Sequence, residues 1–174
     1  MKLLQLCVLG SMAVFTTHTF AKQHTVSLGY AQTDIEDNFD LKGMNAQYRY
    51  ETTSPVSFLA SVSYQTGDDQ WHEAPDEQYS IDAKHLTLLA GPAYRFNDVV
   101  SAYVVAGYAL SEVESSYEYP GYSEQFDLSE TNFAYGAGII INPTEYISVN
   151  LGYEATEVDS AKLSGFNIGL GYRF

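Results

Sequence analysis

The sequence contains 174 residues, of which 22 are acidic and 8 are basic, so its formal net charge is −14 at pH 7. A chain this acidic repels nucleic-acid phosphates, which excludes nucleic-acid binding as a function class. Tyrosine, phenylalanine and glycine are abundant, with 15, 9 and 13 residues. Aromatic and glycine-rich segments separated by turn residues favour an all-β fold, either a sandwich or a barrel.

The first 21 residues predict a secretory signal peptide. A positive start at Lys2 is followed by a short apolar run, and Ala21 is a small residue at the expected cleavage site. The alternative, a transmembrane anchor, needs roughly 20 apolar residues, and this run is shorter. Cleavage before Lys22 would remove Lys2 and the only cysteine, Cys7. The mature domain, 22–174, would then carry 7 basic and 22 acidic residues, a charge of −15, without disulfide or thiolate chemistry.

Eight amphipathic segments follow along the chain. In each, apolar side chains alternate with small or polar ones at a period of two, which is typical of β-strands. The segments cover residues 24–33, 44–51, 56–65, 86–96, 100–110, 132–141, 147–154 and 165–174. Pro92 cannot donate to a ladder, so we expect a bulge or an interruption of pairing there.

The connections between these segments alternate in length. Polar loops at 34–41, 67–78 and 112–130 alternate with tight turns at 52–55, 97–98 and 142–145. A sandwich gives no reason for this alternation, whereas a transmembrane barrel has short periplasmic turns and long extracellular loops. We therefore predict an all-β, eight-stranded antiparallel transmembrane β-barrel whose apolar faces meet lipid.

Six stretches of the sequence carry a family resemblance: 29–34 (GYAQTD), 48–51 (YRYE), 90–98 (AGPAYRFND), 133–138 (FAYGAG), 142–143 (NP) and 169–174 (GLGYRF). They resemble the Ail/Lom/OmpX family of small outer-membrane β-barrel proteins, most closely its OmpX members. The resemblance implies a barrel with a protruding extracellular sheet in a Gram-negative outer membrane. It also implies roles in adhesion, invasion or resistance to host defence. The last strand resembles the signal read by the barrel-assembly machinery, with Phe166, Ile168, Leu170, Tyr172 and Phe174 on one face.

The charged residues on the polar faces of the strands predict an interior network. Five residues fall on these faces: Arg49, Glu51, Arg95, Glu154 and Arg173. An eight-stranded barrel is filled by side chains, which disfavours a porin role and makes ion pairing the expected arrangement. We interpret the network as structural, with a proton path or ligand clamp as the alternative.

The acidic loops also contain aromatic residues that predict partner binding. They are Trp71, Tyr79, Tyr117, Tyr119, Tyr122 and Phe126. Exposed aromatic residues are favoured in recognition, although packing of a protruding sheet would also explain them. The segment 79–84 could in addition offer an unpaired sheet edge to a partner strand. The loop carboxylates lack EF-hand spacing, so a hydrated acidic surface is favoured over a divalent-cation site.

The sequence does not indicate an enzyme. His24, His72 and His85 form no Ser–His–acid pattern with recognisable spacing, and we expect no catalytic, cofactor-binding or metal-binding residues. Two functions remain: a surface factor for adhesion, invasion or defence resistance, and a structural or envelope-stress barrel without a specific ligand. The expected partners of the monomeric barrel are outer-membrane lipid, lipopolysaccharide, the barrel-assembly machinery and host or extracellular proteins.

Overall fold

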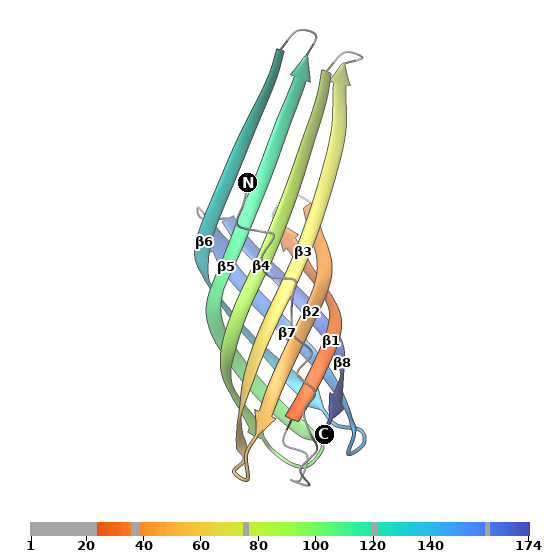
Figure 1. The fold of residues 1–174 in the computed structure, drawn as a ribbon, viewed down its shortest axis with the longest axis vertical. Coiled ribbons are helices and arrows are strands. Elements are labelled where there is room, and N and C mark those ends of the chain that lie inside the picture. Colours follow the sequence, from red (N-terminus) through yellow and green to blue (C-terminus); the bar gives the residue numbers. More distant parts are fainter. Residues whose placement is uncertain (1–23, 36–38, 75–76, 120–121, 159–160) are drawn as a thin grey trace.

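Eight antiparallel strands close into a barrel in the computed structural model (Figure 1). The structure describes residues 24–174 except 36–38, 75–76, 120–121 and 159–160. The strands are β1 (His24–Ile35), β2 (Phe39–Glu51), β3 (Val56–Ala74), β4 (Glu77–Arg95), β5 (Val100–Tyr119), β6 (Tyr122–Ile141), β7 (Ile147–Val158) and β8 (Ala161–Arg173). Each strand pairs with the next, and β8 pairs with β1 to close the barrel. The predicted fold class is confirmed, while the expected signal peptide lies outside the described residues.

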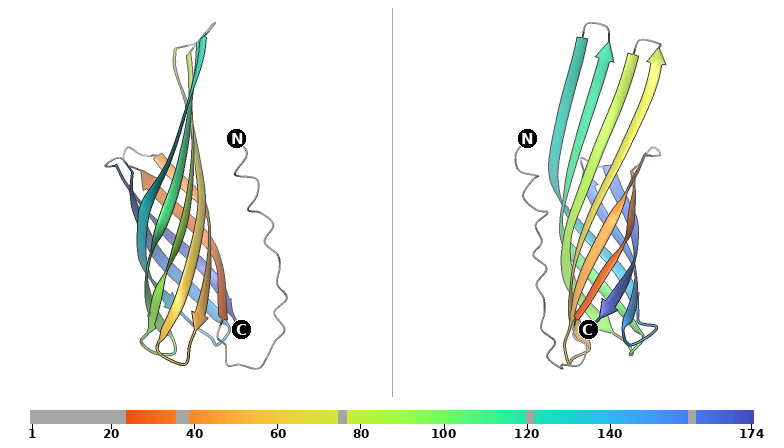
Figure 2. Two further views of the ribbon diagram at one scale, coloured as in Figure 1. Left: turned by 60° about the vertical axis from the view of Figure 1, so that its left-hand side comes forward. Right: turned by 45° about the vertical axis from the view of Figure 1, so that its right-hand side comes forward.

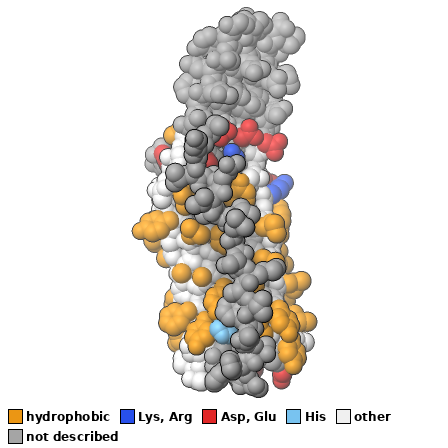
Figure 3. Space-filling view, in the orientation of Figure 1, with side chains coloured by type: hydrophobic (Ala, Val, Ile, Leu, Met, Phe, Trp, Pro, Cys, Tyr) orange, Lys and Arg blue, Asp and Glu red, His pale blue; other side chains and the backbone are white. Residues whose placement is uncertain are grey.

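The wall of the barrel has two different faces because neighbouring strand residues point to opposite sides. Large apolar side chains are exposed on the outside, among them Leu28, Met44 and Leu170. Small and polar side chains such as Asn45 and Ser63 are buried on the inside. Figure 3 shows the apolar side chains spread over the outer surface of the barrel. Among the described residues, no helix is long and apolar enough to cross a membrane.

Aromatic rings gather at the end of the barrel that carries the short turns. The ring centroids of Tyr94 and Phe96 lie 5.3 Å apart, and those of Tyr146 and Tyr172 lie 6.4 Å apart. Aromatic girdles mark the membrane interfaces of outer-membrane barrels. This girdle marks one interface, and the short turns beside it identify that interface as the periplasmic one, because outer-membrane barrels have short periplasmic turns.

The two longest connections differ from the prediction. Residues 67–74, 77–78, 112–119 and 122–130 are strand rather than loop, because β3 and β4 pair up to Ala74 and Glu77 and β5 and β6 up to Tyr119 and Tyr122. Polar residues continue an antiparallel ladder as well as apolar ones do, since the backbone makes the hydrogen bonds. The extended parts of β3 to β6 project beyond the rest of the barrel (Figures 1 and 2). We call residues 67–74, 77–83, 113–119 and 122–128 the protruding sheet.

Two local features adjust the wall. The β4–β5 pairing is interrupted at Gly91 and Pro92 and resumes at Ala93 without a change of register, as expected for a proline in a ladder. Inside the barrel, Tyr103 fills space left by a glycine on β7. A Cβ atom at Gly152 would lie 2.2 Å from the Tyr103 hydroxyl, so this position requires glycine for the close approach.

Candidate functional site

The base of the protruding sheet carries a row of carboxylates. Asp68, Asp82 and Glu114 are opposite one another on β3, β4 and β5, and all three side chains are exposed. The register continues the row to position 127, an aspartate on β6. Like charges directly opposite one another destabilise a sheet. A row retained against this cost is a candidate binding surface, and Figure 3 shows acidic side chains at this level.

Among the described residues, Lys84 partly compensates the carboxylate row. Lys84 lies outside the apolar band, and its Nζ donates to Glu114 Oε1 at 3.3 Å. This hydrogen bond raises the pKa of Lys84 above its ordinary value. Residues 67–83 and 113–128 together contain ten acidic residues and neither lysine nor arginine. The protruding sheet is therefore strongly negative.

The register aligns the predicted aromatic residues on the backbone. Trp71 is opposite Tyr79, which is opposite Tyr117 on the next strand. Tyr119 is opposite Tyr122, and Phe126 is opposite Ser115. The side chains of these six aromatic residues lie outside the described part of the structure. Their strand positions show that all of them belong to the protruding sheet.

The free edges of the sheet are not where the sequence placed them. The predicted edge, 79–84, lies in β4 and pairs with β3 on one side and β5 on the other, so that prediction is wrong. The β2–β3 pairing ends at Thr66, and the β6–β7 pairing begins at Ala134. The outer parts of β3 and β6 therefore form the two edges of the protruding sheet.

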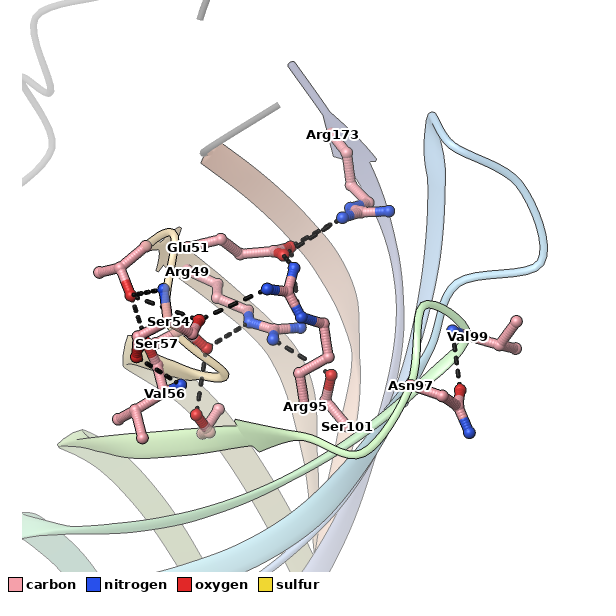
Figure 4. A network of polar contacts seen from close by, with 12 residues as sticks. Arg49, Glu51, Ser54, Val56, Ser57, Arg95, Asn97, Val99, Ser101 and Arg173 are labelled. Atoms are coloured by element: carbon pink, nitrogen blue, oxygen red, sulfur yellow. Dashed lines mark hydrogen bonds and ion pairs between the residues drawn. The ribbon is translucent and has the colours of Figure 1, made fainter. Parts of the chain in front are cut away.

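A cluster of four charged residues occupies the periplasmic end of the barrel interior (Figure 4). Glu51 is the common partner: its carboxylate lies 3.8 Å from Arg49 Nη1, 3.4 Å from Arg95 Nη1 and 3.1 Å from Arg173 Nη2. Glu51 and Arg49 are buried. We call these four residues the arginine cluster.

Two serines that were not among the predicted site residues, Ser57 and Ser101, complete the surroundings of Arg49. Its Nε donates to Ser57 Oγ at 2.9 Å, and its Nη2 donates to Ser101 Oγ at 3.1 Å. Both serines are buried on the inward face. Their place in the alternating pattern beside the short turns is the signal that could have identified them.

Glu154 does not join the arginine cluster. It accepts hydrogen bonds from Thr87 Oγ1 at 2.9 Å, Asn167 Nδ2 at 3.0 Å and Ser63 Oγ at 3.2 Å, and it forms no ion pair with any described residue. The reason is strand direction. β7 starts at the periplasmic turn and rises by about 3.3 Å per residue, so Glu154, seven residues beyond Ile147, lies far from the arginines. Residues that share the inward face of the wall can therefore lie at different levels along the barrel axis.

The remaining candidate residues lie apart from one another. His24 contacts the Tyr48 hydroxyl at 2.7 Å at the periplasmic end, whereas His85 is buried in the barrel and contacts Ser111 at 2.9 Å. The side chain of His72 is outside the described part. The five residues of the predicted assembly signal are exposed on the lipid-facing side: Phe166, Ile168, Leu170 and Tyr172 on β8, and Phe174 directly after it.

The closed wall, its apolar outer surface and its polar interior define an integral outer-membrane β-barrel protein of a Gram-negative bacterium. The chain belongs to the Enterobacterial Ail/Lom protein family, whose model matches residues 2–174. The match covers all the strands and both hairpins of the protruding sheet.

Named relatives share most of the chain. The virulence membrane protein PagC of Salmonella typhimurium is 39% identical over 88% of each chain. Outer membrane protein X of Escherichia coli K12 is 34% identical over 99% of each chain, so the identity to PagC exceeds that to OmpX. The crystal structure of Ail, the attachment invasion locus protein of Yersinia pestis, has a TM-score of 0.72 at 28% identity. It covers 89% of this chain and 100% of Ail. Another Ail structure, with a TM-score of 0.73, contains the heparin analogue sucrose octasulfate.

Proposed function

We propose that the protruding sheet is the binding surface of an adhesion and invasion factor, and that its partner is a basic or amphipathic protein of a host or neighbouring cell. The carboxylate row of Asp68, Asp82 and Glu114 carries the proposal, because it concentrates negative charge on a surface that the barrel does not need for closure. Such a surface speeds encounter with a positive partner. The relatives named for virulence and for attachment and invasion support this function.

The aromatic and edge positions supply the contacts that follow encounter. Trp71, Tyr79 and Tyr117 are aligned across three strands, and tryptophan and tyrosine are the residues that most often dominate binding energy. The edges on β3 and β6 can each accept a partner strand through backbone hydrogen bonds. The proposed partner is therefore recognised by charge first and by aromatic and backbone contacts second.

The negative charge of the protruding sheet also bears on whether this chain binds sulfated glycans. Ail of Yersinia pestis has been crystallised with a heparin analogue. The ten carboxylates of residues 67–83 and 113–128 repel sulfated polyanions, so we expect this chain to bind heparin weakly. If the protruding sheet is the binding surface, a basic protein should therefore bind it well and a sulfated glycan should bind it weakly.

A truncation along one register row tests the proposal. Gly67, Ala83, Val113 and Leu128 are opposite one another on β3 to β6. Replacing 68–82 and 114–127 by short Gly/Ser turns therefore removes the protruding sheet without leaving a strand unpaired. We expect the folded variant to lose binding to cells and to basic matrix proteins. Binding that persists in this variant would contradict the proposal.

A charge-only variant separates electrostatic from aromatic contributions. Asp68→Asn, Asp82→Asn and Glu114→Gln together keep the sheet but remove three charges. We expect slower association and a weaker dependence on salt, because exposed charges are screened over about 10 Å at 0.1 M salt. Trp71→Ala is the complementary variant, and we expect it to speed dissociation instead.

The second candidate function is a structural or envelope-stress barrel without a specific ligand. The parent chain would then show no binding to any cell surface tried, and the truncated variant would restore envelope integrity as well as the parent does. We further propose that the barrel acts as a monomer without catalytic activity, contacts lipopolysaccharide as well as lipid, and is inserted by the barrel-assembly machinery through the exposed face of β8. The exposed Leu170 and Tyr172 support the last proposal.

A further inference from the structure

A vestibule opens at the periplasmic end of the barrel, opposite the protruding sheet. It is a hollow of about 740 Å³ formed by the three short turns and the end of β8. Arg95 and Arg173 line it, and Arg49 lies behind them in the arginine cluster (Figure 4). The hollow is therefore the place where the interior charges meet periplasmic solvent.

The arginine cluster is not electrically balanced. Three guanidinium groups share the single carboxylate of Glu51, which leaves two positive charges in excess, three minus one. Within the described residues, no second carboxylate lies within 4.0 Å of these guanidinium groups. A cluster that served only as an ion-paired plug would be expected to match its charges, because uncompensated buried charge is destabilising.

Hydrogen-bonding groups at the vestibule are also left over. Arg173 Nε is buried without an acceptor among the described residues, although its Nη2 contacts both oxygens of Glu51. Asn142 lines the vestibule and is 4% exposed, and neither Nδ2 nor Oδ1 has a partner in the described part. Buried polar groups are normally paired, so the two unpaired N–H donors, Arg173 Nε and Asn142 Nδ2, point to an anion beside the arginine cluster.

We propose that the vestibule binds a small oxyanion, a carboxylate or phosphate, that enters from the periplasm. Arg95, whose side chain is 29% exposed, receives the ligand, and Arg173 offers its remaining donors. A guanidinium group matches both oxyanions through paired N–H donors. Asp98 and Glu145 also line the vestibule, and their negative charges oppose anion binding there, so the ligand is placed against Arg95 and Arg173. This site is independent of the proposed surface function.

The three arginines make the test specific. The sequence contains only Arg49, Arg95 and Arg173, so a spectrum of arginine Nε–H groups contains one signal for each. The full chain is refolded in uncharged, phosphate-free detergent and titrated with inorganic phosphate and, separately, with succinate. We expect saturable shifts of the Arg95 and Arg173 signals and of the Asn142 side-chain amide. Sodium chloride at equal ionic strength is expected to cause no saturable shift.

Variants give the expected size of the effect. Arg95→Gln retains the buried part of the cluster and is expected to weaken phosphate binding about tenfold or more, the effect of losing one charge-assisted contact. Lys42→Gln removes one positive charge at the extracellular side and is expected to leave binding unchanged. Arg173→Gln is a second variant, used where its far-ultraviolet circular dichroism matches the parent. Shifts that stay linear, or saturable binding equal in Arg95→Gln and the parent, would overturn the proposal.

The source of the oxyanion is resolved in lipid nanodiscs. A dissolved ligand is expected to shift the Arg95 signal only when phosphate or succinate is added, in phosphatidylcholine and phosphatidylglycerol discs alike. A lipid headgroup would shift the signal in phosphatidylglycerol discs before any addition. Either result supports an oxyanion site and identifies its supply. Unchanged signals under all these conditions contradict it.

Discussion

The barrel wall and the protruding sheet are parts of the same strands, yet different forces determine them. In the wall, Leu88 must face lipid and Thr87 must face the interior, so a slip of one residue would exchange the two faces. In the protruding sheet, the backbone ladder continues without a closed barrel around it. The register in the wall therefore fixes the register of the sheet. The wall is constrained by folding, and the sheet is left available for recognition.

The largest expected effect comes from breaking the arginine cluster. Among the described residues, Glu51 is the only carboxylate within 4.0 Å of the three guanidinium groups, and we expect Glu51→Gln to lower the free energy of unfolding by about 3–5 kcal/mol. Urea unfolding in detergent measures it. Glu114→Gln is the control, because its exposed pair with Lys84 contributes at most about 1 kcal/mol. Equal midpoints for the two variants would show that the cluster does not stabilise the wall.

A charge on the outer face should have the next largest effect. Val104 is exposed to lipid on β5, and Val104→Arg is expected to destabilise the barrel in bilayers by about 2–4 kcal/mol. Ser129→Arg, on β6 in the row of Lys84 and Glu112, should change stability little. Folding yields into lipid vesicles compare the two variants. Similar losses of folding yield in both variants would show that position 129 does not lie outside the lipid-facing apolar surface.

A smaller effect is expected at Glu154, which is held inside the wall by uncharged hydrogen-bond donors instead of ion pairs. Glu154→Ala leaves Ser63, Thr87 and Asn167 without their shared acceptor, at an expected cost of about 1–3 kcal/mol. Glu157→Ala, an exposed position on the same strand, should stay within about 0.5 kcal/mol of the parent. We expect surface binding to be unchanged in both. A Glu154→Ala protein as stable as the parent would mean that water replaces the carboxylate.

Deletion of Phe174 should affect assembly in cells more than stability. Its backbone exchanges two hydrogen bonds with His24, at 2.9 and 3.1 Å, at the exposed end of the β1–β8 pairing. We expect near-parental unfolding in detergent but reduced amounts in the outer membrane, with Phe174→Tyr as the control. Normal outer-membrane levels after deletion would contradict an assembly signal in this residue.

The sequence predicted the wall well because two faces constrain every residue there. Alternation alone placed Leu170 outside and Asn45 inside, and the lengths of the connections indicated the sides of the membrane. Alternation does not predict the level of a residue along the barrel axis, however, so Glu154 was grouped with the arginines of the periplasmic end. Alternation also weakens in polar segments, so Asp82 fell outside the eight predicted strand segments although it pairs with Asp68 and Glu114 in the sheet. Pairing between strands, which no single segment encodes, supplied both corrections.

Whether the wall folds independently of the protruding sheet is tested by measuring the stability of the chain without that sheet. The variant lacking 68–82 and 114–127 is unfolded in urea beside the parent in the same detergent. Because the wall determines the register, we predict the same unfolding midpoint within error, together with the same heat-modifiable migration on gels. A loss approaching that of Glu51→Gln would show that the sheet stabilises the wall, and would contradict the separation of folding from recognition.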